Sequence, residues 1–284
     1  MQQIQVTSPQ QLTRRVLSLL LAAVVITTGF QRSTPVVNPK ADQNTILRVL
    51  TWNAYFRNSN LDALAATVTK QQPDVIALQE LGSALAAAIS TALRDDYPYQ
   101  ELYPTGSPSG MGILSRYPFL STTAPDYGPT TACNCQVVQI DFHGQPITVI
   151  NAHPWPPKVT VTLAKGLTHL VDFDTAEQSR IFDQLLLRIQ QTTTPLLVLG
   201  DLNTMPFQAN VQQLRARLHD TWAETGVGAG NTFPAERRDH NLPPFPFIRI
   251  DYIFHDDHWL AHQSWVDSIA GSDHRSVGAD LELR

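Results

Sequence analysis

Cysteine is scarce in this sequence, and neither sign of charge is in large excess. Only two of the 284 residues are cysteine, Cys133 and Cys135, and this pair lacks the Cys-x-x-Cys spacing of redox and zinc sites. Twenty basic and 25 acidic residues give a net charge of −5, which offers no electrostatic argument for a polyanionic partner. Low-complexity segments and convincing repeats are also lacking. Because 43% of the residues are hydrophobic, the composition suits one soluble α/β domain with a large core.

The oxidation state of the two cysteines stays open at this level. Residues two apart on a strand lie about 6.6 Å from each other on one face, at the outer limit for a disulfide. A disulfide formed in an oxidising compartment and two free thiols are both compatible with the sequence. No neighbouring residue would activate either thiol as a nucleophile, so catalytic thiol chemistry is not expected.

The N-terminus lacks a hydrophobic run of the ~20 residues that a membrane span needs. Its uncharged apolar stretch, residues 16–30, follows Arg14-Arg15 and has the length of the apolar part of a signal peptide. We predict that residues 1–30 are a signal peptide or a membrane anchor, and that residues 31–45 are a polar, proline-punctuated linker. Residues 46–284 would then be a folded domain in the periplasm, outside the cell or held at the membrane by the N-terminus.

Polar side chains recur where apolar, strand-like runs end. The run Leu196–Leu199 reads as a strand buried on both faces. Gly200 follows it, and Asp201 and Asn203 then share one face of an extended chain. Such recurrence indicates a site built from strand ends. The other polar positions of this kind are Asn53 after 46–52, Glu80 after 74–79, His153 after 147–150, Asp251 within 250–254, and Ser272-Asp273-His274.

Four apolar stripes with helical spacing alternate with these runs. The first stripe follows Ser59-Asn60, which can cap a helix. We predict that all four are helices with their apolar side on the core. The stripes are Leu61/Leu64/Ala65/Val68, Leu85/Ala88/Ile89/Ala92, Ile181/Phe182/Leu185/Leu186/Ile189 and Val211/Leu214/Leu218.

In their order, these polar blocks resemble the signature of the endonuclease/exonuclease/phosphatase superfamily. That superfamily includes deoxyribonuclease I-like nucleases, abasic-site endonucleases, sphingomyelinases and phosphoinositide phosphatases. The resemblance implies an exported, bacterial-type member with an α/β fold, in which two packed mixed sheets flanked by helices form a four-layer α/β/β/α sandwich. The blocks are Asn53, Gln79-Glu80, Ser109–Arg116, Gly200–Asn203, Asn231–Pro234, Arg249–Tyr252 and Ser272–His274.

The resemblance also implies a metal site. Glu80 would be the main ligand, with Asn53 beside it and Asp273 as a further carboxylate ligand or neighbour. A carboxylate, an amide and waters suit Mg²⁺, which keeps much of its hydration shell. Mn²⁺ and Ca²⁺ are the alternatives.

The implied catalytic residues surround the expected phosphate. Asp201 would orient the attacking water, and Asn203 would hold a phosphate oxygen or bind the metal. Asp251 would pair with His274 and fix its tautomer, so that the imidazole acts as a base or stabilises the phosphorane. His153 would donate a proton to the leaving oxygen or bind the phosphate.

His153 also separates branches of the superfamily. Abasic-site repair enzymes usually carry tyrosine there, whereas deoxyribonuclease I-like and lipid-directed members carry histidine. The resemblance places a carboxylate behind this histidine, and Glu101 is the residue that resembles it. Ser272–Ser276 lacks the C-terminal pattern of the phosphoinositide 5-phosphatases, which disfavours that branch.

The predicted function is therefore that of an exported, divalent-metal-dependent phosphoesterase, acting as a monomer. Its substrate would be a nucleic acid, a phospholipid headgroup or a small phosphoester, and the sequence does not choose among them. The alternative is a catalytically silent scaffold that serves as a binding or membrane-tethered interaction protein. Competent residues at every expected position disfavour this alternative.

Two segments leave further alternatives. His255, His258 and His262 could form a second metal site, but the turn formers around them favour a solvated loop and a strand start. The stretch Trp155–Asp174 is rich in apolar residues, and it could be a packed loop or an apolar lip that meets lipid.

Overall fold

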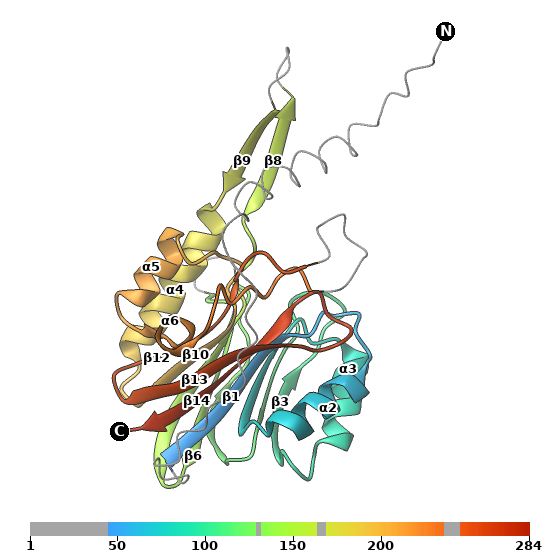
Figure 1. The fold of residues 1–284 in the computed structure, drawn as a ribbon, viewed down its shortest axis with the longest axis vertical. Coiled ribbons are helices and arrows are strands. Elements are labelled where there is room, and N and C mark those ends of the chain that lie inside the picture. The colour runs from blue at the N-terminus through green and yellow to red at the C-terminus, as the bar shows by residue number, and fades with distance from the viewer. Residues whose placement is uncertain (1–44, 129–131, 164–168, 236–244) are drawn as a thin grey trace.

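The computed structural model describes residues 45–128, 132–163, 169–235 and 245–284. The predicted signal peptide or anchor at residues 1–30, and the linker up to residue 44, lie outside the described residues. Within the described part, two six-stranded sheets pack face to face (Figure 1).

The first sheet has the strand order β13-β14-β1-β2-β4-β3. Its central pair, β1 and β2, is parallel, and β14 runs antiparallel to β1. The strands are β1 (Ile46–Asn53), β2 (Val75–Gln79), β3 (Tyr99–Tyr103), β4 (Met111–Ser115), β13 (Trp259–Ser268) and β14 (Arg275–Leu283).

The second sheet has the order β11-β12-β10-β7-β6-β5. Here β7 and β10 are the parallel pair, and β12 runs antiparallel to β10. The strands are β5 (Phe119–Thr123), β6 (Cys135–Phe142), β7 (Gln145–Ala152), β10 (Leu196–Asp201), β11 (His219–Asp220) and β12 (Asp251–His255).

Helices cover the outer face of each sheet. In Figure 1, α2 (Leu61–Gln71) and α3 (Ser83–Ala92) lie on one side, and α4 (Ala176–Gln191) and α5 (Ala209–Arg215) on the other. The short helix α6 (Thr221–Thr225) follows β11. Asn60 caps α2, as predicted, because its side chain accepts a hydrogen bond from the Ala63 N–H at 3.2 Å. The predicted four-layer α/β/β/α sandwich is confirmed.

Alternation along the central strands explains why they are apolar on both faces. In β10, Leu197 and Leu199 enter the core between the sheets, whereas Leu196 and Val198 pack towards α4 and α5. Strand β2 does the same, since its alternate residues divide between the inner core and the layer under α2 and α3. These strands are buried on both faces, and their first polar side chains stand at their ends.

The segment between β7 and α4 differs from the expectation. Strands β8 (Lys158–Leu163) and β9 (His169–Asp174) pair antiparallel as a two-stranded sheet, and Figure 1 shows this hairpin projecting from the sandwich. The packed-loop alternative is therefore wrong, because the backbone of this segment forms paired strands. Contact of this segment with lipid stays a prediction. Among the described residues, no helix has both the length and the apolarity to cross a membrane.

Candidate active site

The site forms where the two parallel strand pairs end. Asn53 and Gln79 are register partners at the ends of β1 and β2, and Leu199 and Asn151 are partners in β10 and β7. Parallel strands finish at the same edge of a sheet, so the polar residues after them are brought together. The two sheets meet at this edge, where the Asn53 side-chain amide donates to Asp201 Oδ2 at 3.0 Å.

Glycine is required just before Asp201. The φ of Gly200 is +149°, and a Cβ on it would lie 1.9 Å from the Ala152 carbonyl oxygen of β7. No side chain fits that gap, so only glycine lets β10 approach β7 this closely. Asp201 then turns the chain, because its Oδ1 accepts a hydrogen bond from the Asn203 N–H at 2.9 Å.

Three residues near the strand ends hold a left-handed backbone. Their φ values are 61° for Tyr55, 50° for Glu80 and 49° for Asn203. None of them is glycine, so each conformation costs free energy that surrounding contacts must offset. Such strain concentrates at functional sites, which supports the assignment of this edge as the site.

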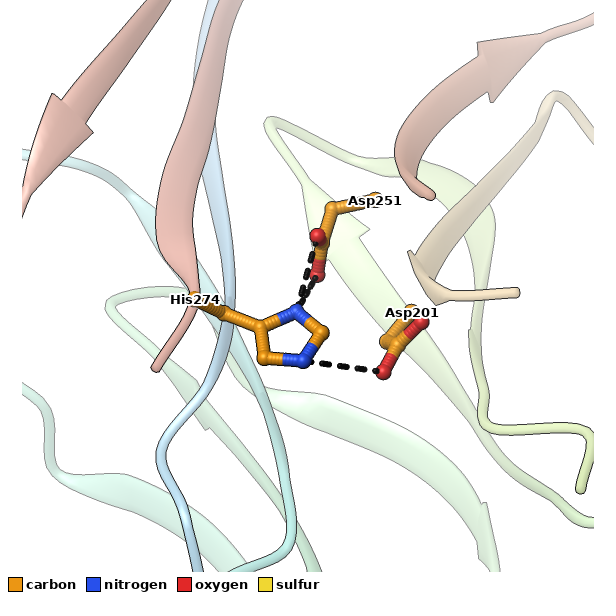
Figure 2. A group of neighbouring side chains, drawn as sticks. All are labelled: Asp201, Asp251 and His274. Atoms are coloured by element: carbon orange, nitrogen blue, oxygen red, sulfur yellow. Dashed lines mark hydrogen bonds and ion pairs between the residues drawn. The ribbon is translucent and has the colours of Figure 1, made fainter. Parts of the chain in front are cut away.

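His274 lies between two buried carboxylates (Figure 2). Its Nδ1 is 3.0 Å from Asp251 Oδ2, and its Nε2 is 3.7 Å from Asp201 Oδ2. Ser272 supports this arrangement, because its Oγ donates to the Asn53 carbonyl at 2.6 Å and accepts from the His274 N–H at 3.0 Å. The predicted Asp251–His274 pair is therefore formed.

Electrostatics favour an imidazolium between the two carboxylates. Burial alone lowers the pKa of His274, but the charges of Asp251 and Asp201 outweigh burial and raise this pKa to about 10. Burial likewise raises the pKa of Asp201, yet the neighbouring His274 and His153 lower it to about 2. Burial raises the pKa of Asp251 above its ordinary value. The favoured state is an Asp201 carboxylate beside a protonated His274.

The predicted metal ligands lie next to this group. Asn53 donates to Glu80 Oε1 at 3.1 Å, while its own Oδ1 accepts from the Tyr55 N–H at 3.1 Å. Glu80 has a raised pKa because it is buried. In the described residues, Asp201, Asp251 and His274 have candidate ligand atoms within 4.8 Å of one another, a group that contains neither Glu80 nor Asp273. Asp201, Asp251 and Glu80 together carry more negative charge than the His274 imidazolium neutralises. This excess of negative charge suits a divalent cation.

His153 lies near the same carboxylate oxygen as His274. Its Nε2 is 3.6 Å from Asp201 Oδ2, its side chain is buried, and its Nδ1 has no hydrogen-bond partner among the described residues. The expected contact with Glu101 is not formed, because the Glu101 carboxylate accepts from the Tyr103 hydroxyl at 2.7 Å on β3, the edge strand. The prediction that Glu101 is the carboxylate behind His153 is therefore wrong.

Asn203, the last predicted catalytic residue, contacts Asp201 through its backbone N–H and the loop after β7 through its side chain. Its side-chain amide donates to the Pro154 carbonyl at 3.1 Å, one residue beyond His153. This hydrogen bond connects the loops that follow β7 and β10.

A buried polar bridge under the site escaped the sequence analysis. The Gln79 side-chain amide donates to Asn151 Oδ1 at 2.7 Å, and Asn151 Nδ2 donates to the Leu78 carbonyl at 2.9 Å. This bridge joins the residue before Glu80 to the strand that carries His153. The sequence does place an amide residue at the end of each of these two apolar runs. In the structure both amides are fully buried, and buried polar groups require hydrogen-bond partners.

The three C-terminal histidines do not converge on a second metal site. His255 lies 2.8 Å from Glu224, His258 lies 2.9 Å from Asp256, and His262 bonds to Glu282 across β13 and β14. The favoured loop-and-strand interpretation holds for the backbone. However, the His255 side chain is buried rather than solvated.

Cys133 and Cys135 form a disulfide, with their Cα atoms 5.2 Å apart. This distance is shorter than the strand spacing assumed from the sequence, because Asn134 between them has a φ of 47° and strand β6 begins only at Cys135. Of the two alternatives that the sequence left open, the disulfide is the one present.

Comparison with known proteins agrees with this geometry. The family model of the Endonuclease/Exonuclease/phosphatase family matches residues 50–274. The chain belongs to this family. The match begins in β1 and ends at His274, so it includes every residue of the group in Figure 2. The family and the relative below are phosphoester hydrolases, as predicted.

Individual members of the family are distant from this chain. The inositol phosphosphingolipids phospholipase C of Saccharomyces cerevisiae is 29% identical over an alignment of 168 residues, which covers 53% of this chain and 34% of that protein. This chain thus matches about a third of the length of that relative. A D. rerio TDP2 structure, complexed with a single-strand DNA product, superposes with a TM-score of 0.66 at 19% identity, covering 84% of this chain and 100% of that chain. An endonuclease/exonuclease/phosphatase from Beutenbergia cavernae gives a TM-score of 0.60 at 20% identity, over 84% of this chain and 72% of that chain. These two structures establish the shared fold.

Proposed function

We propose that this protein is a divalent-metal-dependent hydrolase of phosphodiesters. The observation that carries the proposal is the position of Asp201, whose Oδ2 lies 3.6 Å from His153 Nε2 and 3.7 Å from His274 Nε2. A carboxylate held between two imidazoles can orient a water while both rings reach the phosphate that the water attacks.

Each side chain then has a distinct task. Asp201, which its low pKa keeps ionised, accepts a hydrogen bond from the attacking water and orients it. Because this carboxylate is a weak base, it takes the proton of the water only as the bond to phosphorus forms. His274, kept protonated and oriented by Asp251, places a positive charge beside the phosphate oxygens as negative charge develops on them. His153 donates a proton to the leaving oxygen, and Asn203 holds the phosphate.

The metal would be held by Glu80, with Asn53 and waters completing its surroundings. When bound, Mg²⁺ would polarise the phosphoryl oxygens and neutralise part of their charge. Mn²⁺ or Ca²⁺ could take its place. The hydrogen bond from Asn53 to Glu80 orients this carboxylate.

A phospholipid headgroup diester is the favoured substrate. The relative named for inositol phosphosphingolipids supports this choice, because it is similar in sequence as well as in activity class. The TDP2 structures support the fold and not a DNA substrate, since their identity to this chain is 19% or lower for the DNA-bound and C. elegans forms. The histidine at position 153 agrees with a lipid-directed member and equally with a deoxyribonuclease I-like one, so the choice of lipid rests on the sequence relative.

The protein is also proposed to act beyond the cytoplasmic membrane. The N-terminal segment with its arginine pair is the first support. The Cys133–Cys135 disulfide is the second, because disulfides persist in oxidising compartments. We expect the exported protein to be a monomer.

The decisive experiment measures hydrolysis by the purified full chain. Bis(p-nitrophenyl) phosphate should be cleaved in Mg²⁺, and a chelator should abolish the cleavage. Sphingomyelin, inositol phosphosphingolipid and single-stranded DNA should then be compared at equal concentration, with the lipids expected to be preferred. Inactivity on all four compounds would refute the proposal and favour a silent binding scaffold, whereas preference for DNA would refute the lipid assignment alone.

A further inference from the structure

We propose that the disulfide loop Cys133–Asn134–Cys135 positions His153, and that turnover depends on the disulfide being closed. The inference rests on the proposed function, because it assigns His153 a role in hydrolysis. It adds a positioning residue, Asn134, and a dependence on redox state to that function.

The loop is attached directly to the backbone of His153. The His153 N–H donates to the Asn134 carbonyl at 2.9 Å. Cys135 is the register partner of Ala152, the last residue of β7. The hydrogen bond therefore extends the β6–β7 ladder by one step, at the point where β7 has ended and the chain enters the site.

Asn134 accepts this hydrogen bond although it lies outside the regular strand conformation. Its φ of 47° is left-handed, a region that asparagine adopts more readily than most residues with a side chain. The flanking cysteines close a covalent ring around that residue, with Cα atoms 5.2 Å apart. The ring limits the conformations that Asn134 can take, and so keeps its carbonyl in place.

The loop is part of the core and not a surface turn. Cys133, Asn134 and Cys135 are 6%, 1% and 2% exposed. Both cysteines pack in one cluster with Ala152 and Leu202, the neighbours of His153 and Asp201 in sequence. A change in the loop is therefore transmitted to both strand ends of the site, because a close-packed core leaves no free volume to absorb it.

The His153 ring has few other directed contacts. Its Nδ1 has no hydrogen-bond partner among the described residues, and its Nε2 is 3.6 Å from Asp201, longer than a hydrogen bond. Glu101, the carboxylate expected to orient the ring, bonds to Tyr103 instead. The backbone hydrogen bond from the disulfide loop therefore fixes the position of the His153 backbone, from which the ring extends.

Opening the ring has a defined chemistry. A dithiol reductant attacks the disulfide, the S–S bond breaks, and two electrons and two protons convert Cys133 and Cys135 to thiols while the reductant becomes a cyclic disulfide. Asn134 is then free to return to an extended conformation. We expect the His153 backbone to follow, with a loss of turnover of about 10- to 100-fold, because small misplacements of reacting groups have effects of this size.

The test is a cycle with two changes, measured on bis(p-nitrophenyl) phosphate in Mg²⁺. The first change opens the ring, by a dithiol or by the double variant Cys133→Ser/Cys135→Ser. The second is His153→Ala. Opening the ring should lower kcat of the otherwise unaltered chain with KM within about twofold, and should have little further effect once His153 is removed. Equal fractional losses with and without His153 would show a general structural role and overturn the proposal.

Variants at Asn134 keep the test decisive if circular dichroism shows that the open-ring protein is unfolded. With the disulfide intact, Asn134→Gly should retain near-full kcat, because glycine adopts positive φ freely. Asn134→Val should lower kcat, because a β-branched residue resists this conformation. Equal kcat for the two variants would overturn the proposal. An oxidised, unaltered chain without Mg²⁺-dependent hydrolysis would instead refute the proposed function.

Discussion

The substitution Asp251→Asn tests the electrostatic core of the site. It preserves the size of the side chain and can keep one hydrogen bond to His274 Nδ1, but it removes the buried negative charge 3.0 Å away. Both side chains are almost inaccessible, Asp251 at 0% and His274 at 7% exposure, so solvent screens the interaction little. The change therefore isolates the contribution of charge.

The magnitude follows from the proximity of the pair. A charged partner within hydrogen-bonding distance shifts a pKa by about 1–3 units, and each unit corresponds to about 1.4 kcal/mol. The pKa of His274 should fall from its raised value, and kcat should fall by about 10²- to 10⁴-fold, as when oriented acid–base help is lost. Removing one member of a buried ion pair costs about 3–5 kcal/mol. Because Asn keeps a hydrogen bond, we expect a loss of about 1–3 kcal/mol in unfolding free energy.

The pH dependence has a definite sign. The pKa of His274 in the folded protein, about 10, lies above the ordinary value of 6.5. Protonated His274 therefore stabilises the fold fully below about pH 6.5, and this contribution disappears as pH rises through about 10. The stability difference between the unaltered protein and Asp251→Asn should accordingly be largest in mildly acidic solution.

The assay combines steady-state kinetics in Mg²⁺ with urea unfolding and NMR titration of His274 in chelator. Asp141→Asn is the matched control, because Asp141 accepts from the Gly144 N–H at 2.7 Å in the turn between β6 and β7, at the end opposite to Cys135 and Ala152. The control should leave kcat unchanged. If Asp251→Asn retains near-full kcat, or if His274 already titrates below pH 7 in the unaltered protein, the assignment is refuted.

Three further predictions follow from other parts of the molecule. Glu80→Gln should shift the Mg²⁺ concentration for half-maximal activity upward by about 10- to 100-fold, and an unchanged titration would show that Glu80 is structural. Asn151→Ala should lower the unfolding free energy by about 1–3 kcal/mol, since it removes one of the two acceptors of the buried Gln79 amide; a smaller loss in the Gln79→Leu background, measured by urea unfolding, would confirm the coupling. Lysines in place of the leucines at residues 19–21 should retain the protein in the cytoplasm, since each charge in an apolar segment costs about 2.5–3.5 kcal/mol; fractionation with protease accessibility checks this, and export of the altered chain would contradict it.

Local sequence patterns predicted the elements that carry the site. The run of four aliphatic residues before Gly200 predicted a strand buried on both faces, and its alternate residues pack into two different cores. The stripe after Asn60 similarly forms a capped helix. Strand ends in parallel pairs share an edge, which brings Asn53 next to Glu80 in one sheet and Asp201 next to His153 in the other. The family resemblance, and not this rule, grouped the two pairs in one site, where Asn53 contacts Asp201.

Interactions between distant segments were beyond these patterns. The assignment of Glu101 failed because nothing local shows that β3 becomes an edge strand with this carboxylate on Tyr103. The Gln79–Asn151 bridge links residues 72 positions apart. The disulfide likewise depends on a left-handed Asn134 that no spacing rule reveals.

One of these missed features, the Gln79–Asn151 bridge, fixes one half of the site relative to the other. The first sheet supplies Asn53 and Glu80, and the second supplies Asp201 and His153. Apolar packing between sheets is nondirectional and tolerates small shifts, whereas hydrogen bonds have narrow geometry. The Asn53–Asp201 contact and the Gln79–Asn151 bridge therefore define the relative position of the sheets more tightly than their shared core does. A site of this kind should lose turnover before it loses stability when such a bridge is weakened, because hydrolysis depends on the distances that the bridges control.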